Sequence, residues 1–102
     1  MASIIWTEPA LDQLNDIAEY IALVNPDAAQ GLVASVFKKV GRLERFPQSG
    51  RKSPELPVTD YREILVPPCR IFYRHRESKV LILHVMREER DLRRFMLDQE
   101  RP

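Results

Sequence analysis

The sequence predicts an α+β domain whose elements follow the order β-α-α-β-β-β, with a short C-terminal helix or tail. Two stretches of helical apolar spacing occupy the first half of the chain, and three short strand-like runs joined by tight turns follow residue 60. Because the apolar stripe of each helix needs a partner, we expect a helix hairpin that covers one face of an antiparallel sheet. The 102 residues are expected to form a single domain, residues 1–102.

The first half begins with a short run, Ser3–Trp6, whose β-branched and aromatic residues predict a strand of edge length. A helix is expected next, because Thr7 suits an N-cap and Pro9 suits the first turn. Asn25-Pro26 ends that helix and opens a second one, which is expected to end at Phe46-Pro47. The expected apolar faces are Leu11, Leu14, Ile17, Ala18, Ile21 and Val24 on the first helix, and Ala29, Leu32, Val33, Val36, Phe37, Val40 and Leu43 on the second.

The second half reads as a loop followed by three strands. Residues 47–60 form a proline-rich loop of about a dozen residues, at the upper edge of ordinary loop lengths. The expected strands are residues 61–66, 69–75 and 79–86, joined by turns at Pro67-Pro68 and Glu77-Ser78. The continuous apolar run at 80–83 predicts a central strand covered on both faces. Alternation in the middle strand predicts that Cys69, Ile71 and Tyr73 point to one face of the sheet.

Charge is divided unevenly along the chain. Residues 1–37 contain five acids and no Lys, Arg or His, whereas residues 38–102 contain all 16 Lys and Arg against 10 acids. The formal charges of the two parts are −5 and +6, which the net charge of +1 conceals. Such asymmetry indicates a charged partner for one face of the molecule without identifying that partner.

Arginine is the most conspicuous residue of the basic part. Its planar guanidinium presents paired donors to phosphates and carboxylates, so a small sheet rich in arginine suggests an anionic partner. The alternative is that these side chains only solvate one face of the sheet. The arginines concerned are Arg62, Arg70, Arg74, Arg87, Arg90, Arg93 and Arg94.

Composition bounds the cellular setting. No apolar run approaches the ~20 residues that a membrane span needs, so no membrane association is expected. The first residues lack the basic and long apolar regions of a signal peptide, and the single Cys69 has no partner for an internal disulfide. A cytoplasmic location is the simplest expectation.

Few residues suit catalysis. The sequence has no Gly-rich phosphate loop, CxxC pair, HExxH or GxSxG motif, so we expect no cofactor and no metal site. His84 follows the apolar run and is either a general base or a structural histidine. Tyr73 either stacks on a nucleic-acid base or belongs to the core or its rim. Cys69, beside Arg70, is either a thiol of lowered pKa or a small strand residue.

The order and spacing of several short motifs resemble the RelE/ParE superfamily of toxins from bacterial type II toxin–antitoxin modules. These motifs are Trp6, Ala10-Leu11, Leu14, Ile17, Tyr20-Ile21, Pro26-Asp27-Ala28-Ala29, Leu43, Phe46-Pro47, Gly50-Arg51, Tyr61-Arg62-Glu63, Arg70-Ile71-Phe72-Tyr73, Val80, Ile82-Leu83-His84-Val85 and Arg90-Asp91-Leu92. The resemblance covers nearly the whole chain. It favours the ParE-like branch, because Arg90-Asp91-Leu92 follows the last strand and no tyrosine follows Tyr73.

The resemblance implies a growth-inhibiting toxin that a cognate antitoxin neutralises, with DNA gyrase as the favoured target, no catalytic residues and no specific DNA binding by the toxin alone. The alternative branch would be a ribosome-dependent mRNA endonuclease. A third possibility is a non-toxic member that only binds its antitoxin, as a scaffold or co-repressor. For the endonuclease, the candidate catalytic residues are Arg62, Arg70, Tyr73, His84 and Arg87.

Two binding surfaces are expected. Arg87, Arg90 and Arg93 are assigned to the target, because they follow the last strand, where side chains can reach outward. The helix faces are more apolar than short strands can cover, which predicts a groove for a partner segment. The residues assigned to the antitoxin are Leu11, Leu14, Ile17, Ile21, Val33, Phe37, Arg62, Arg70 and Arg74.

Overall fold

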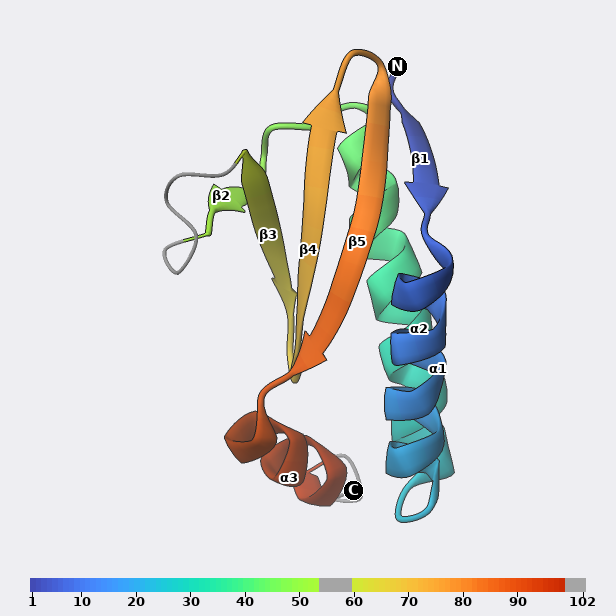
Figure 1. Ribbon diagram of the computed structural model, residues 1–102. Helices are drawn as coiled ribbons and strands as arrows, with labels where there is room; N and C mark the ends of the chain where they lie inside the picture. Colours follow the sequence, from blue (N-terminus) through green and yellow to red (C-terminus); the bar gives the residue numbers. More distant parts are fainter. Residues whose placement is uncertain (54–59, 99–102) are drawn as a thin grey trace.

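The computed structural model describes residues 1–53 and 60–98 and confirms the α+β architecture (Figure 1). A helix hairpin packs on one face of a five-stranded sheet, and a short third helix follows the last strand. The elements are β1 (Ser3–Trp6), α1 (Glu8–Ala22), α2 (Pro26–Gly41), a 3-10 turn (Arg42–Glu44), β2 (Arg51–Lys52), β3 (Tyr61–Val66), β4 (Cys69–Arg76), β5 (Lys79–Arg87) and α3 (Glu89–Asp98).

The strand order is β1-β5-β4-β3-β2, and two features of this sheet differ from the prediction. β1 pairs with β5 in parallel, so the sheet is antiparallel only from β5 to β2. β2 lies within the segment that was predicted to be a loop. Both features depend on partners that are distant in sequence, whereas the antiparallel strands β3, β4 and β5 are joined by tight turns that are visible locally.

The helix hairpin is defined by two side-chain caps. Thr7 Oγ1 accepts a hydrogen bond from Ala10 N at 3.4 Å and donates one to Ile82 O at 2.7 Å, which ties the start of α1 to β5. Asn25 Oδ1 accepts from Ala28 N at 3.1 Å, and its Nδ2 donates to Met96 O at 3.3 Å. The second cap therefore begins α2 and also holds α3 against the turn of the hairpin.

The hydrophobic core lies between the hairpin and the sheet. The predicted apolar stripes are largely confirmed, except that Leu11, Val24 and Phe37 are 42%, 50% and 45% exposed. Regular α-helix ends at Gly41 rather than at Phe46-Pro47, and a 3-10 turn then buries Leu43. The buried residues on the two helices are Ala10, Leu14, Ile17, Ile21, Ala28, Ala29, Leu32, Val36 and Val40.

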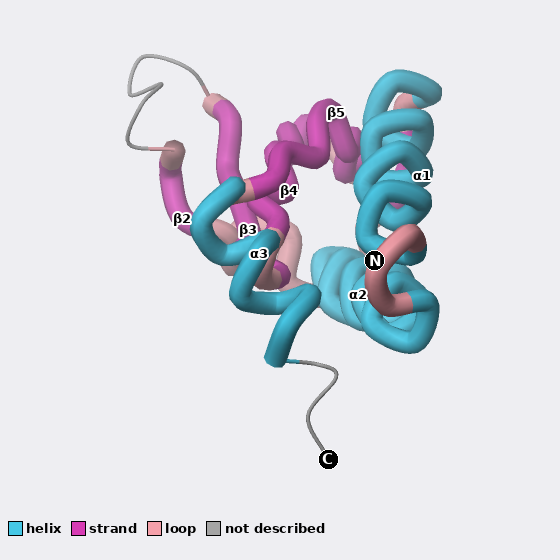
Figure 2. Tube along the Cα trace, turned by 90° about the horizontal axis from the view of Figure 1, so that it is seen from below, coloured by secondary structure: helices cyan, strands magenta, loops and turns pink. Residues whose placement is uncertain are grey.

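Only one face of the sheet is covered by helices (Figure 2). Val80 and Ile82 of β5 are buried on the helix side, but Leu81 and Leu83 are only half-buried, so the prediction of cover on both faces was wrong. A bulge at Leu83 shifts the register between β4 and β5. Val85 is thereby returned to the core, and its N–H donates to Gln13 Oε1 of α1 at 2.8 Å.

α3 lies below the end of β5, beside the lower end of the helix hairpin (Figures 1 and 2). Leu92 and Met96 are buried and join the core, while the opposite side of the helix faces solvent. The expected C-terminal helix is therefore confirmed, and it places several arginines on an exposed surface.

Candidate functional site

A buried carboxylate organises the arginines on the open face of the sheet. The side chain of Glu63 on β3 is 0% exposed and accepts hydrogen bonds from Arg51 Nε at 2.9 Å and Arg70 Nε at 2.7 Å. Arg70 also lies 3.7 Å from a carboxylate oxygen of Glu88 and 5.1 Å from the ring centroid of Phe72. The Arg70 side chain is only 16% exposed. Through Glu63, which also binds Arg51, it links β4 to β3 and β2, and through Glu88 it links β4 to the chain after β5.

A second arginine group closes the other end of this face. Arg74 and Arg76 donate to the two carboxylate oxygens of Asp60 at 3.1 and 3.0 Å. The hydrogen bond from Arg76, with the charges of both arginines, lowers the pKa of Asp60 below its ordinary value. Arg74 also lies over the ring of Tyr61, 5.0 Å from its centroid. These contacts show that the arginines of the strands are engaged within the chain.

Tyr73 lies on the helix-covered face and is fully buried. Its hydroxyl accepts from Gly50 N and donates to Pro47 O, both at 2.9 Å, while Arg62 Nη1 donates to Gly50 O at 2.8 Å. Burial raises the pKa of Tyr73 above its ordinary value. A Cβ at Gly50 would stand 2.5 Å from the Tyr73 hydroxyl and 2.8 Å from Glu63 O, so only glycine fits there.

The five candidate catalytic residues of the endonuclease branch do not converge. Arg62 is paired with Tyr73 in the sheet register, and both belong to the helix-covered face. Arg70 and His84 belong to the opposite face, where the bulge leaves His84 exposed beside Phe72. Arg87 forms an ion pair with Glu89 and lies 4.9 Å from the ring centroid of Tyr20. The structure therefore assembles no shared acid–base centre from these five side chains.

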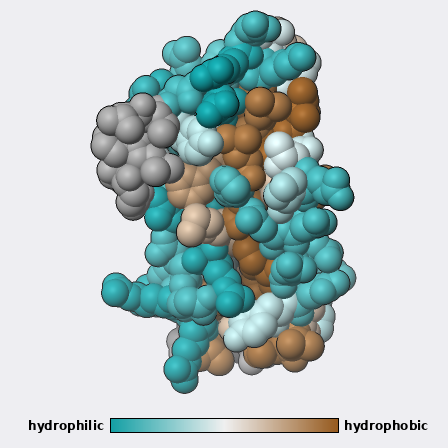
Figure 3. Space-filling view, in the orientation of Figure 1, coloured by the Kyte–Doolittle hydropathy of each residue, from teal (hydrophilic) through white to brown (hydrophobic). Residues whose placement is uncertain are grey.

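The open face also exposes apolar side chains. Ile5, Leu65 and Met86 are 39%, 43% and 51% exposed. The space-filling view shows brown apolar side chains running down the β5 side of the molecule, between hydrophilic margins (Figure 3).

α3 presents the arginines that were assigned to the target. Arg90 and Arg93 are exposed, and helical spacing adds Arg94 and Leu97 to the same outer side. No carboxylate in the described part of the chain lies within ion-pair distance of Arg90, Arg93 or Arg94. Leu97 was missed in the sequence analysis, although its spacing from Arg90 and Arg93 was available.

The residues assigned to the antitoxin are dispersed. Leu14, Ile17 and Ile21 are buried in the core, so a partner cannot contact them while the hairpin is closed. Val33 is half-buried, whereas Leu11 and Phe37 are exposed; the Phe37 ring packs 5.0 Å from that of Trp6. The structure adds an apolar groove of about 520 Å³ on the outer side of the hairpin. Its lining includes Ala18, Ala22, Ala29 and Val33.

Cys69 is a free, buried strand residue. Burial raises the pKa of its thiol to about 11, so the alternative of a lowered pKa was wrong. Residues 1–53 and 60–98 contain no group of three or more His, Cys, Asp or Glu side chains that could hold a metal ion. None of the helices in the same residues is long and apolar enough to cross a membrane.

The fold and these surfaces define a class of small α+β domain with exposed arginine and apolar patches on its helices. Comparison with known proteins is consistent with this class. The family described as "ParE toxin of type II toxin-antitoxin system, parDE" matches residues 4–92. The chain belongs to the ParE toxin family, within the RelE/ParE superfamily, as its sequence resemblance indicated.

The similar proteins include one named after RelE and one from a ParDE system. Toxin RelE2 of Caulobacter vibrioides is 33% identical over 86 residues, which cover 83% of this chain and 93% of that toxin. A chain from the chromosomal ParDE toxin–antitoxin system of P. aeruginosa has the same fold, with a TM-score of 0.73. It is 24% identical, and the match covers 85% of this chain and 96% of the other. Membership of a type II family implies a cognate antitoxin as partner.

Proposed function

We propose that this toxin inhibits DNA gyrase, that it does so without hydrolytic chemistry, and that its cognate antitoxin neutralises it by covering the helix hairpin. The observation that carries the proposal is the separation of the candidate catalytic residues. Tyr73 and Arg62 are bonded to the Gly50 loop on one face, while His84 lies on the other. Proton transfer to and from a ribose hydroxyl needs two groups within hydrogen-bond reach of one substrate, and this arrangement does not supply them.

The outer side of α3 is proposed as the surface that contacts gyrase. Arg90, Arg93 and Arg94 are exposed there, and Leu97 is 51% exposed. Arginine and apolar side chains in one patch are typical of protein interfaces, because arginine combines charge-assisted hydrogen bonds with apolar contact. Arg87 is proposed to support this surface from the end of β5, since Tyr20 and Glu89 already hold its guanidinium.

The antitoxin is proposed to bind the outer side of the hairpin through an amphipathic segment. Leu11 and Phe37 offer exposed apolar contacts, and the groove between α1 and α2 is lined mainly by small residues. The exposed acids of α1, which include Asp12 and Asp16, favour a partner segment with basic residues beside its apolar ones. Arg62, Arg70 and Arg74, which were also assigned to the antitoxin, have a smaller part in this proposal, because each bonds within the chain.

A second candidate function is an mRNA endonuclease. One observation favours it: His84 is exposed on the same face as Arg70 and Arg74, where a nucleic-acid strand has access. Against it, Arg70 is held by Glu63, and the net charge of +1 gives little of the electrostatic attraction that ribosomal RNA would favour. A non-toxic scaffold or co-repressor is the remaining alternative.

The test compares two reactions with the same purified toxin. We expect the toxin to inhibit the supercoiling of DNA by gyrase and to leave mRNA intact in a translation reaction. Adding the antitoxin should restore the supercoiling activity of gyrase. His84→Ala serves as the control, because His84 is exposed and its loss should change neither fold nor gyrase inhibition. Codon-specific mRNA cleavage that disappears in His84→Ala would assign the endonuclease function instead, and inactivity in both reactions would favour the scaffold.

A further inference from the structure

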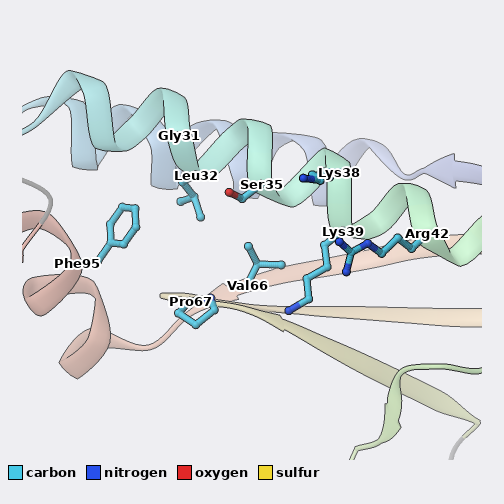
Figure 4. Close-up of a pocket in the computed structure, with 9 residues that line it drawn as sticks. All are labelled: Gly31, Leu32, Ser35, Lys38, Lys39, Arg42, Val66, Pro67 and Phe95. Atoms are coloured by element: carbon cyan, nitrogen blue, oxygen red, sulfur yellow. The ribbon is translucent and has the colours of Figure 1, made fainter.

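A second groove runs along α2 on the side that faces β3 and α3 (Figure 4). Its volume is about 500 Å³. Gly31, Ser35 and Lys38 lie along a single side of α2, at helical spacings of four and three, and Arg42 continues this row at the start of the 3-10 turn. The end of β3 and the third helix provide the facing wall.

One half of this groove is apolar. Leu32 and Val66 are buried at its floor, and Pro67 begins the turn after β3. Phe95 reaches from α3 toward α2 and closes the end of the groove beside Gly31 (Figure 4). A Cβ at Gly31 would meet nothing within 4 Å, so the space above the helix is open there.

The other half is cationic. Lys38, Lys39 and Arg42 line it, and none of the lining residues in the described part of the chain is acidic. Lys39 Nζ donates to Leu65 O at 2.7 Å, which fixes this ammonium group between α2 and β3. No carboxylate in the described part of the chain lies within ion-pair distance of these three side chains. Three positive charges therefore line this half of the groove, with no carboxylate of residues 1–53 and 60–98 paired to them.

We propose that this groove binds an acidic peptide segment of a partner protein, with an apolar side chain over Leu32, Val66 and Phe95 and carboxylates at Lys38, Lys39 and Arg42. Charge complementarity selects the anion, and the adjacent apolar floor selects a chain that carries aliphatic side chains beside its acids. Lys and Arg donate charge-assisted hydrogen bonds to carboxylates, which fix the register of such a segment.

A nucleic-acid strand fits this groove less well. A strand presents phosphates at regular intervals and needs cations along its path, whereas here the cations occupy one end and Phe95 and Pro67 the other. The acids on α1 also reduce long-range attraction for a polyanion. The inference goes beyond the proposed function, because this groove lies apart from the outer side of the hairpin. It does not depend on whether the target of the toxin is gyrase or the ribosome.

The probe is a fluorescein-labelled synthetic peptide in which leucines alternate with pairs of glutamates, titrated with the full chain and followed by anisotropy. We expect saturable binding that weakens with added salt. We expect no binding of the same peptide with glutamine for glutamate, or of a labelled oligothymidylate. Tighter binding of the oligothymidylate, or equal binding of the glutamine peptide, would overturn the proposal.

Two matched pairs of variants locate the site. Lys38→Glu with Arg42→Glu should weaken peptide binding about 30-fold or more, whereas Arg45→Glu with Lys79→Glu changes the net charge equally outside the groove and should weaken it about threefold or less. Gly31→Leu should fill the apolar half and abolish binding, while Gly41→Leu, on the same helix with equally open space, should not. Both leucines favour helix over glycine, so loss of fold does not explain the difference.

Equal loss in both members of either pair would contradict the proposed site. So would concentration-dependent self-association of the chain that only Gly31→Leu abolishes, because the groove would then belong to a second copy. Circular dichroism melting of all four variants, within about 5 °C of the unmodified chain, accompanies the titrations as the control for folding.

Discussion

The arginines of the strands and the arginines of α3 belong to the same basic half of the chain, yet the molecule uses them differently. Arg62, Arg70 and Arg74 bond to a backbone carbonyl or a carboxylate within the chain. Arg90 and Arg93 are exposed, and no carboxylate of the described residues pairs with them. On composition alone, both groups of arginines were interpreted as a signal for an anionic partner. The difference teaches that an arginine indicates a binding surface only after its partners within the chain are known.

The largest expected effect tests the internal group. Glu63→Ala removes the buried carboxylate that accepts from Arg51 and Arg70, and leaves the more distant carboxylate of Glu88, at 3.7 Å, beside the Arg70 guanidinium, whose side chain is only 16% exposed. Breaking a buried ion pair in this way costs about 3–5 kcal/mol of the free energy of unfolding. Urea denaturation should show that loss. Asp60→Asn, at a more exposed pair of arginines, should change the midpoint far less; equal effects would contradict the distinction between the two pairs.

Tyr73→Phe sharpens the comparison between structural and catalytic roles. The change leaves Gly50 N and Pro47 O without their buried partner, and an unsatisfied group of this kind costs about 1–3 kcal/mol. We expect a lower melting temperature with growth inhibition retained at a temperature where the variant remains folded. Complete loss of toxicity in a folded Tyr73→Phe protein would instead indicate that the hydroxyl takes part in chemistry.

A smaller effect concerns Cys69 at alkaline pH. Burial raises its pKa from 9.0 to about 11, so the folded state holds the thiol proton over a range in which the unfolded state has lost it. Stability is therefore unaffected by this group below pH 9 and falls as pH rises from about 9 to 11. Cys69→Ala should lack this part of the pH dependence. The pKa of Tyr73 is also raised, and this residue contributes equally in the unmodified chain and in Cys69→Ala. The difference between their stabilities at each pH therefore reports the thiol alone.

Much of the fold could be predicted because its signals are local. The caps at Thr7 and Asn25 and the turns between β3, β4 and β5 depend on neighbouring residues, and their elements were found within about two residues, apart from the C-terminal end of α2. The parallel pairing of β1, the short β2 and the bulge at Leu83 depend on contacts across the sheet. The pattern of apolar and polar residues in a single sequence carries no information on such pairings.

The candidate site was predicted less completely for the same reason. The exposure of Arg90 and Arg93 followed from their position after the last strand, and helical spacing would also have given Leu97. The internal role of Arg70 requires the register that brings Glu63 beside it, and the burial of Ile17 and Ile21 requires knowledge of which helix side meets the sheet. These facts arise only when the chain is folded.

The central claim is that α3 carries the gyrase contact while the arginines of the strands hold the fold. The most direct measurement is the concentration of toxin that half-inhibits gyrase supercoiling, for the unmodified chain, Arg90→Glu with Arg93→Glu, and the matched control Arg45→Glu with Lys79→Glu. We expect the α3 variant to need at least about tenfold more protein, with a free energy of unfolding within about 0.5 kcal/mol of the original and a control that inhibits normally. Undiminished inhibition by the α3 variant would contradict the account.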